Sequence, residues 1–365
     1  MKPKWSVKVY EKKDINKIFE LDTTVHPKEK CSIEKWMRWW NWKYVNNPAG
    51  FPKIWLAEIN GKIIGYYAII HIMIKCGDKI IVGSQSVDTM THPHYRHQRI
   101  FETLARRTYD QAKKDGIKLV YGFPNEYSYP GFVKKLGWFN VCSMPSVIKP
   151  YNIKNLFKHR IKNKFLQKIC ILTGNTFINI FYRICKPKKP PEVAGLTIYE
   201  IAFFDDSIDD FWKKISKEHN ILVVRNKIYL NWKYVSVPDV NYIKYLAEKD
   251  GEVCGYVVLR CVKKQDLLIG FIYDIMASLH QPLTILSLIS KAIEYFENKK
   301  VDAIFYIGTN HTINRIFKNA GFIMIPPFLF KRYFIIHNIS SEIPTTYLKD
   351  KRNWFVQMMG DSDAI

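Results

Sequence analysis

The sequence is missing the marks of several large classes of protein. No stretch of its 365 residues is apolar for long enough to span a bilayer, and residues 1–14 contain no apolar signal core. The seven cysteines have neither CxxC nor metal-ligand spacing, and an odd number without a framework predicts a reducing, cytoplasmic location and no structural zinc. Ser-His-Asp arrangements, HExxH and Walker loops are absent too, which leaves a hydrolase, a zinc enzyme or an NTPase without support.

Acidic residues are scarce relative to basic ones. Lysine and arginine number 56 against 33 aspartates and glutamates, so the formal charge is +23. Such an excess favours anionic partners, which include phosphorylated cofactors, nucleic acid, an anionic membrane surface and acidic substrates. The hydrophobic fraction of 47% is enough for buried cores, and the length suits about two domains of ordinary size.

The most informative stretch runs from Ser84 to Trp138. Gln85–Thr91 is rich in β-forming residues, and the apolar spacing that starts at Ile100 predicts an amphipathic helix. Ile117–Tyr121 then has the composition of a short buried strand. The turn before the helix carries His94, Arg96, His97 and Arg99. Because a helix start offers free N–H groups and a positive dipole end, this turn predicts a phosphate site.

This stretch resembles the GNAT superfamily of acyl-CoA N-acyltransferases. The family's pyrophosphate loop usually runs Pro-x-Tyr-Arg-Gly-x-Gly-Ile, and it is followed by an Asn and a short helix that ends in Gly-Phe. The matching residues are Pro93, Tyr95, Arg96, Ile100, Asn125, Gly137 and Trp138. The sequence departs from the loop pattern at His97, Arg99 and Phe101, where glycine is usual or frequent.

The resemblance implies that acyl-CoA lies between two parallel strands that splay apart, here Gln85–Thr91 and Ile117–Tyr121. The implied cofactor-binding residues are Thr91, Arg96, His97, Gln98, Arg99, Ile100, Phe101 and Asn125. Asn125 can instead cap the short helix. Arg99 can serve as a phosphate contact if it keeps helical dihedral angles, because its Cβ then points away from the N–H groups.

Two residues are the catalytic candidates. Asp88 is the only carboxylate on the first strand and is the candidate general base, although a buried, hydrogen-bonded structural carboxylate is the alternative. The family's usual general acid is a tyrosine at the position of Val133, so that acid is absent here. Tyr129, on the preceding loop, is the candidate to protonate the leaving thiolate, with Tyr127 as the alternative.

An internal repeat relates the two halves of the chain. Asn41–Val45 recurs as Asn231–Val235, and a hairpin turn at Asn60-Gly61 recurs as Asp250-Gly251. Asp88, Asn125 and Gly137 of the first copy correspond to Asp274, Asn310 and Gly321 of the second. The second copy replaces the basic loop with Ala277–Pro282, which has no arginine, so we expect only the first copy to bind the cofactor.

The predicted fold is therefore α/β, with two tandem GNAT-like domains, each a mixed, mostly antiparallel sheet flanked by helices. The expected units are residues 1–148, a basic helical linker at 149–195, a second domain at 196–335, and a C-terminal strand and tail at 336–365, with Asn353–Met359 as the strand. The linker is expected to pack on both domains, and the alternative is a helix on an anionic membrane surface. The tryptophans of Ile33–Val45 fit core packing or the aromatic wall of an acceptor pocket.

The predicted activity is transfer of an acetyl or other acyl group from acyl-CoA to a primary amine of a small molecule or amino sugar, without a metal. One alternative is an aminoacyl-tRNA-dependent transferase of similar two-copy fold, since the positive charge would suit tRNA. The other is a degenerate, non-enzymatic GNAT fold that binds an anionic surface or nucleic acid.

Overall fold

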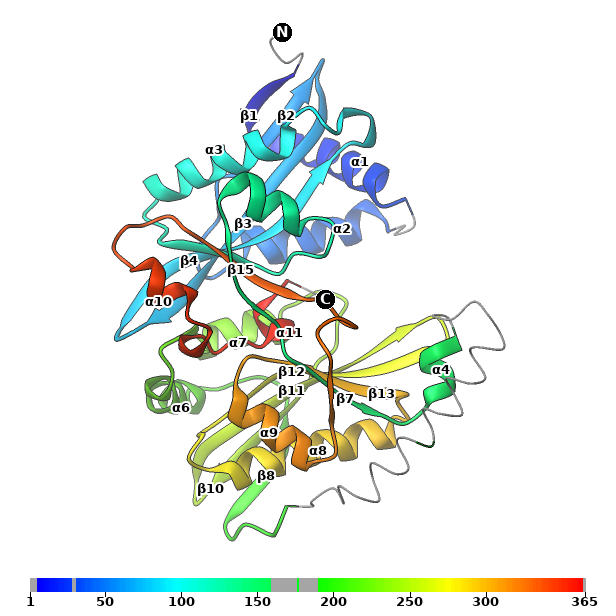
Figure 1. Ribbon diagram of the computed structural model, residues 1–365, viewed down its shortest axis with the longest axis vertical. Helices are drawn as coiled ribbons and strands as arrows, with labels where there is room; N and C mark the ends of the chain where they lie inside the picture. The colour runs from blue at the N-terminus through cyan, green and yellow to red at the C-terminus, as the bar shows by residue number, and fades with distance from the viewer. Residues whose placement is uncertain (1–4, 28–30, 159–175, 177–189, 364–365) are drawn as a thin grey trace.

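The structure is a computed structural model that describes residues 5–27, 31–158, 176 and 190–363. The chain forms two mixed α/β halves, one above the other in Figure 1, and each half is built on one sheet. Of the predicted linker at 149–195, residues 159–175 and 177–189 lie outside the described residues, and its described part includes α4 (Ile153–Lys158). No helix among the described residues is long and apolar enough to cross a membrane.

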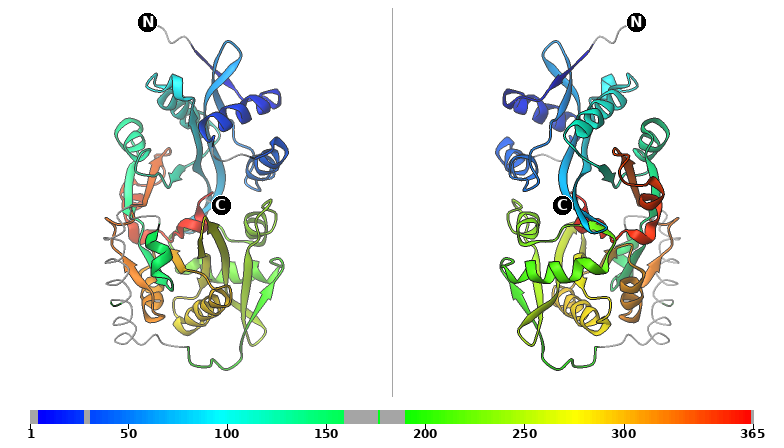
Figure 2. Two further views of the ribbon diagram at one scale, coloured as in Figure 1. Left: turned by 90° about the vertical axis from the view of Figure 1, so that its right-hand side faces the viewer. Right: turned by 90° about the vertical axis from the view of Figure 1, so that its left-hand side faces the viewer.

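The first sheet has eight strands in the order β1-β2-β3-β4-β5-β15-β6, with β9 paired to β3. They are β1 (Ser6–Val9), β2 (Trp55–Ile59), β3 (Lys62–Cys76), β4 (Lys79–Thr91), β5 (Leu119–Gly122), β6 (Phe139–Ser143), β9 (Ile221–Val223) and β15 (Tyr333–Asn338). All pairs are antiparallel except β4 with β5. Helices α1 (Ile15–Val25) and α2 (Ile33–Trp40) lie on one side of this sheet and α3 (Ile100–Lys114) on the other (Figure 2).

The second sheet repeats this pattern in the order β14-β7-β13-β12-β11-β10-β8. Its strands are β7 (Ser146–Pro150), β8 (Leu196–Ile201), β10 (Ile243–Lys249), β11 (Glu252–Lys264), β12 (Leu267–Ala277), β13 (Ala303–Ile307) and β14 (Ile323–Ile325). The remaining helices are α6 (Ser207–Ile215), α7 (Lys227–Tyr234), α8 (Pro282–Asn298), α9 (His311–Asn319), α10 (Thr345–Lys349) and α11 (Met358–Asp361). The predicted α/β class with two flanked, mostly antiparallel sheets is confirmed.

Turn chemistry explains why the same hairpin forms twice. Asn60 and Gly61 have φ angles of 48° and 77°, and Asp250 and Gly251 have 54° and 82°. A two-residue turn with both φ values positive matches the right-handed twist of the two strands that it joins, and Asn-Gly and Asp-Gly tolerate those angles. The hairpins β2–β3 and β10–β11 follow, each with a register shift near its turn.

The two halves exchange strands, which the sequence does not predict. β7 leaves the first half and pairs with β13 and β14, while β15 returns from the second half and pairs with β5 and β6. The expected boundaries after residues 148 and 335 therefore run through β7 and β15. Residues 353–359, expected as a strand, instead contain the end of a 3₁₀ turn, two isolated bridges and the start of α11. The backbone N–H of Val356 and that of Gln357 donate to side chains rather than to a strand.

The two copies of the Asn-Trp-Lys-Tyr-Val motif contact each other where the two halves of the molecule join. The indole of Trp42 donates to the carbonyl of Trp232 over 2.7 Å, and the indole of Trp232 donates to the carbonyl of Trp42 over 2.9 Å. The two rings stack at a centroid distance of 5.0 Å. Reciprocal contacts of this kind are what a two-fold relation between copies produces. One hydrophobic core continues from the α1 and α2 side of the first sheet into the second half.

Candidate active site

A groove opens where β4 and β5 part. The two strands are paired only at Ser84–Val120 and Gln85–Tyr121, although β4 continues to Thr91. The groove has a volume of about 280 Å³. Its lining includes residues of β4 and of the chain that follows β5: Ser86, Val87, Thr89, Gly122, Phe123, Asn125, Ser128 and Trp138. This is the splay between parallel strands that the sequence alone could not show.

A β-bulge lies in β4 beside this groove. Tyr67 pairs with Thr89 and Ile69 pairs with Ser86, so Val87 and Asp88 together oppose Ala68. A bulge leaves one residue out of the ladder and frees its backbone groups. A free N–H at this point of β4 can polarise a carbonyl oxygen held in the groove.

The basic loop folds as a turn that leads into α3. Pro93–Tyr95 forms a 3₁₀ turn, and Arg99 is the N-cap of α3. Arg99 has φ 59° and ψ 18°, so it does not keep the helical dihedral angles on which its predicted role depended; His97 is left-handed as well, with φ 65°. These left-handed positions are where the family pattern has glycine, which adopts them without strain. A cavity of about 350 Å³ lies here, lined by His97, Arg99, Glu102 and Lys135.

The other predicted cofactor residues have mixed positions. The side chain of Ile100 is buried, and the ring of Phe101 packs on Tyr67 and Phe132, so these two residues can offer only backbone N–H groups to a phosphate. Arg96 and Gln98 are exposed on the loop, and Thr91 pairs with Gly65 at the end of β4. Asn125 lines the groove and also caps the next turn, because its Oδ1 accepts from the backbone N–H of residues 127 and 128.

A second cavity, of about 360 Å³, lies on the opposite side of the end of β4. Side chains alternate along a strand, and accordingly Val87 and Thr89 line the groove while Asp88 and Met90 line this second cavity. Its wall is aromatic and acidic, with Asp22, Trp36, Trp39, Trp40, Tyr44, Tyr66, Asp88 and Asp363 among the lining residues. Trp40 of α2 is buried in the core, as one of the two interpretations predicts, and it also lines this cavity; an acceptor pocket here stays a prediction.

Asp88 is partly buried, hydrogen-bonded and ion-paired, and its role as general base or as structural carboxylate stays a prediction. Its side chain is 25% exposed, accepts from the Tyr44 hydroxyl over 2.6 Å and pairs with the Lys43 ammonium at 3.2 Å. Burial alone would lower the pKa of Lys43, but the carboxylates of Asp88 and Asp363 outweigh it and raise that pKa. Lys43 therefore stays charged and holds the two carboxylates at one end of the cavity.

Tyr129, the predicted general acid, stacks on Tyr333 with ring centroids 4.1 Å apart. Its neighbours Ser128 and Phe132 line the groove, whereas its own ring lies against β15. The structure places Asp88 in the second cavity and Asn125 in the groove, on opposite sides of β4, and Tyr129 lines neither. The protonation of the leaving group by Tyr129 stays a prediction.

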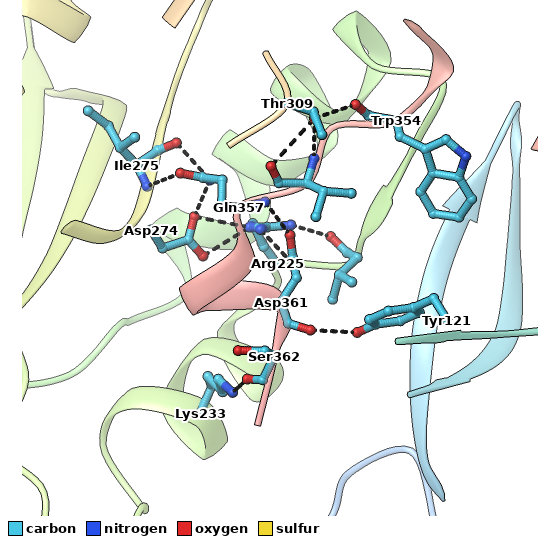
Figure 3. Close-up of polar contacts among 12 residues, drawn as sticks. Tyr121, Arg225, Lys233, Asp274, Ile275, Thr309, Trp354, Gln357, Asp361 and Ser362 are labelled. Atoms are coloured by element: carbon cyan, nitrogen blue, oxygen red, sulfur yellow. Dashed lines mark hydrogen bonds and ion pairs between the residues drawn. The ribbon is translucent and has the colours of Figure 1, made fainter. Parts of the chain in front are cut away.

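The C-terminal segment brings a further carboxylate that the sequence did not single out. Asp363 pairs with Lys43 at 3.1 Å, accepts from the Gln85 amide over 3.3 Å and lines both cavities. The acidic end of the chain was visible in the sequence, but nothing local indicated where it would lie. Tyr121 of β5 donates to the carbonyl of Asp361 over 2.9 Å, which ties this segment to the floor of the first half (Figure 3).

A buried ion cluster anchors the same segment to the second half. Arg225, with no exposed side-chain surface, pairs with Asp274 at 3.0 Å and with Asp361 at 2.8 Å (Figure 3). Tyr234 and Gln357 also donate to Asp274. The hydrogen bond from Tyr234 to Asp274 corresponds in the repeat to the one from Tyr44 to Asp88. The pair faces a cavity in the first copy and is buried in the second.

The chain itself fills the second copy's groove. β12 and β13 pair only at residues 269–271 with 303–305, and Gln357 occupies the space beyond, where it exchanges hydrogen bonds with the backbone of Ile275. Thr309 bonds to the neighbouring Val356. At the loop that replaces the basic turn, the Glu218 carboxylate accepts from the Ser278 hydroxyl and the Leu279 N–H. An internal side chain thus stands where a cofactor anion would bind.

Comparison with known proteins agrees with this geometry. Residues 6–140 match the family described as Acetyltransferase (GNAT) domain, which agrees with the family resemblance of the basic loop. A search of curated proteins gives no match.

Several solved structures share the fold over more than nine-tenths of this chain. A GCN5-related N-acetyltransferase from Anabaena variabilis ATCC 29413 has 10% identity and a TM-score of 0.64, and the match covers 92% of this chain and 73% of that one. A probable N-acyltransferase from Enterococcus faecalis V583 has 12% identity, a TM-score of 0.62 and coverage of 92% and 72%. An N-myristoyltransferase from Saccharomyces cerevisiae, solved with myristoyl-CoA and inhibitors, has 13% identity, a TM-score of 0.59 and coverage of 93% and 81%. The tandem arrangement of two GNAT-like folds is thus shared at the level of fold.

Proposed function

We propose that the protein is an N-acyltransferase that moves an acetyl or other acyl group from acyl-CoA to the primary amine of a small cationic molecule. The observation that carries the proposal is the pair of cavities on the two sides of the end of β4. They meet at Asp363, which lines both. A donor in one cavity and an acceptor in the other would bring their reacting atoms together beside Asp363, where the two cavities meet.

The donor side fits acyl-CoA. Phe132 lines the groove and packs on Phe101 in the first turn of α3, next to the loop of Arg96 and Arg99. The first N–H groups of a helix have no intrahelical partner and face a phosphate favourably. Acyl-CoA would supply the activated acyl group as a thioester, and the N–H freed by the bulge at Val87–Asp88 would polarise its carbonyl oxygen.

The acceptor side fits a positively charged amine. In a chain with a formal charge of +23, this cavity gathers the carboxylates of Asp22, Asp88 and Asp363 against one lysine. Flat indole faces beside carboxylates attract an ammonium group through both charge and cation–π interaction. The same lining repels phosphate, and for that reason the cavity does not favour tRNA as the molecule that enters it.

The chemistry needs a neutral amine, so a carboxylate must take a proton from the ammonium form. Asp88 and Asp363 stand at the end of the cavity next to β4 and are the two candidates. When the nitrogen bonds to the acyl carbon, the carbon–sulfur bond breaks and CoA leaves as a thiol after it gains a proton. General-base assistance of this kind is worth roughly 10²–10⁴ in rate.

The test is release of free CoA thiol from acetyl-CoA, followed with a thiol reagent in the presence of an aliphatic diamine, glucosamine or an uncharged alcohol. We expect release with an amine and none with the alcohol. Thr89→Trp, which fills the groove from an exposed position, should abolish release, and Asp88→Asn should lower kcat by at least about tenfold. Asp110→Asn, an equal charge change on the exposed face of α3, is the control.

Two results would contradict the proposal. One is a protein that binds acetyl-CoA but releases no thiol with any amine, which would favour the non-enzymatic alternative. The other is unchanged activity in Thr89→Trp, because the groove would then not be the donor site.

A further inference from the structure

A cavity of about 580 Å³ lies outside the site described above, beside the start of α9 in the second half. Its lining comes from the end of β6, the start of α9, β14 and the turn Lys351–Asn353. The lining residues used below are Thr309, Asn314, Arg315, Lys318, Lys351 and Arg352. Its volume is in the range of roughly 300–1,000 Å³ that is typical of small-molecule sites.

The cavity lies beside the capped start of α9. Asn310 caps α9 in the second copy as Asn125 caps the corresponding turn in the first. The lining contains no residue of β12 or β13. The cavity is therefore separate from the groove between those two strands, which Gln357 occupies.

The charge of the lining has one sign. Arg315, Lys318, Lys351 and Arg352 line the cavity, and none of its lining residues is acidic. Arg352 is paired with Asp350, whereas Arg315, Lys318 and Lys351 form no ion pair with any described residue. Three unneutralised cations around one concave surface raise the local concentration of anions.

The floor of the cavity adds a second, independent sign of a ligand. Asn314 is only 4% exposed, and its Nδ2 donates to the carbonyl of Gly308 over 2.9 Å. Its Oδ1 has no hydrogen-bond partner among the described residues. A buried amide oxygen without a partner is costly, and a hydrogen-bond donor on a bound molecule would satisfy it.

We propose that this cavity binds a small phosphorylated molecule whose phosphate lies against Arg315, Lys318 and the first turn of α9, and whose hydroxyl or amine groups face Asn314. Arginine and the free N–H groups of a helix start suit phosphate oxygens. The concave shape, with Trp354 and Met324 as apolar walls, and the volume of about 580 Å³ suit a small molecule. The proposal does not depend on the acyltransferase activity.

Titration calorimetry with pyrophosphate tests the proposal. The affinity of the full native chain is compared with that of three double variants. Arg315→Glu with Lys318→Glu should remove binding at this cavity, with an affinity loss of at least tenfold. Lys263→Glu with Lys264→Glu, an equal charge reversal at an exposed strand end, should not. Arg96→Glu with Arg99→Glu removes the loop of α3, and one binding event should survive in that variant.

The proposal is overturned if the two reversals at Arg315 and Lys318 leave pyrophosphate binding unchanged. It is also overturned if the Lys263 and Lys264 control loses as much affinity, since net charge alone would then explain the binding. A single-stranded RNA oligonucleotide that binds through Arg315 and Lys318 far more tightly than pyrophosphate would replace the small molecule with a nucleic acid.

Discussion

Arg99→Gly separates two effects that the native loop combines. Arg99 occupies the left-handed region, where a Cβ costs an L-residue about 1–2 kcal/mol. Glycine removes that cost. It also makes the unfolded chain more flexible, which lowers the free energy of unfolding by about 0.4–1 kcal/mol. The free energy of unfolding of the variant without ligand should therefore stay level or rise, by up to about 1.5 kcal/mol.

The effect of Arg99→Gly on acyl-CoA binding should have the opposite sign. Arg99 lines the cavity at the start of α3, and a charge-assisted hydrogen bond to phosphate is worth roughly 1.5–3 kcal/mol. At 1.4 kcal/mol for each factor of ten, its loss should weaken acetyl-CoA binding about 10- to 150-fold. Arg99→Glu should lose more, because it places like charge against the phosphate.

Urea unfolding measures the first effect and calorimetric titration with acetyl-CoA the second. Lys113→Gln removes one exposed positive charge at the other end of α3 and should change acetyl-CoA affinity little. The reasoning fails if Arg99→Gly is clearly less stable than the native protein without ligand. It also fails if Arg99→Gly binds acetyl-CoA more tightly, because the arginine would then obstruct the site.

Two further predictions concern the second half and its pH dependence. Arg225→Met leaves the buried carboxylates of Asp274 and Asp361 without a cation and should lower the free energy of unfolding in urea by about 3–5 kcal/mol. The control Arg352→Met removes an exposed ion pair and should leave that free energy nearly unchanged. Equal losses in the two variants would refute the role of burial. Burial lowers the pKa of His219 to about 4. Below pH 6.5 its imidazole therefore binds a proton in the unfolded chain but stays neutral in the folded chain until the pH approaches 4. Stability should therefore fall as pH drops from 6.5 to 4, by about 3 kcal/mol from this group. His219→Gln should flatten that part of the profile, and parallel profiles for the two proteins would contradict the assignment.

The local elements around the site were predictable because their causes are local. The Asn60-Gly61 turn and the apolar stripe of α3 each follow from residues close together in the sequence. The left-handed angles of His97 and Arg99 were indicated indirectly, since both stand where the family pattern has glycine. The condition set for Arg99, helical dihedral angles, is not met, because the loop keeps the left-handed conformation that glycine would allow.

The non-local features were not predictable from spacing. β15 pairs with β5 across more than two hundred residues, and no sequence pattern specifies which strand completes a sheet. Asp363 reaches Lys43 only because Gln357 and Asp361 fix the preceding turn in the second half. The motif that contains Lys43 and Tyr44 was found as a repeat, but its contact with Asp88 needed the fold.

The central claim is that one acyl-CoA site exists, in the groove between β4 and β5 of the first half. Calorimetric titration of the full chain with acetyl-CoA tests it most directly. The account predicts a stoichiometry of one per chain, because Gln357 and Glu218 occupy the corresponding places in the second half. A stoichiometry of two, or no binding at all, would contradict it.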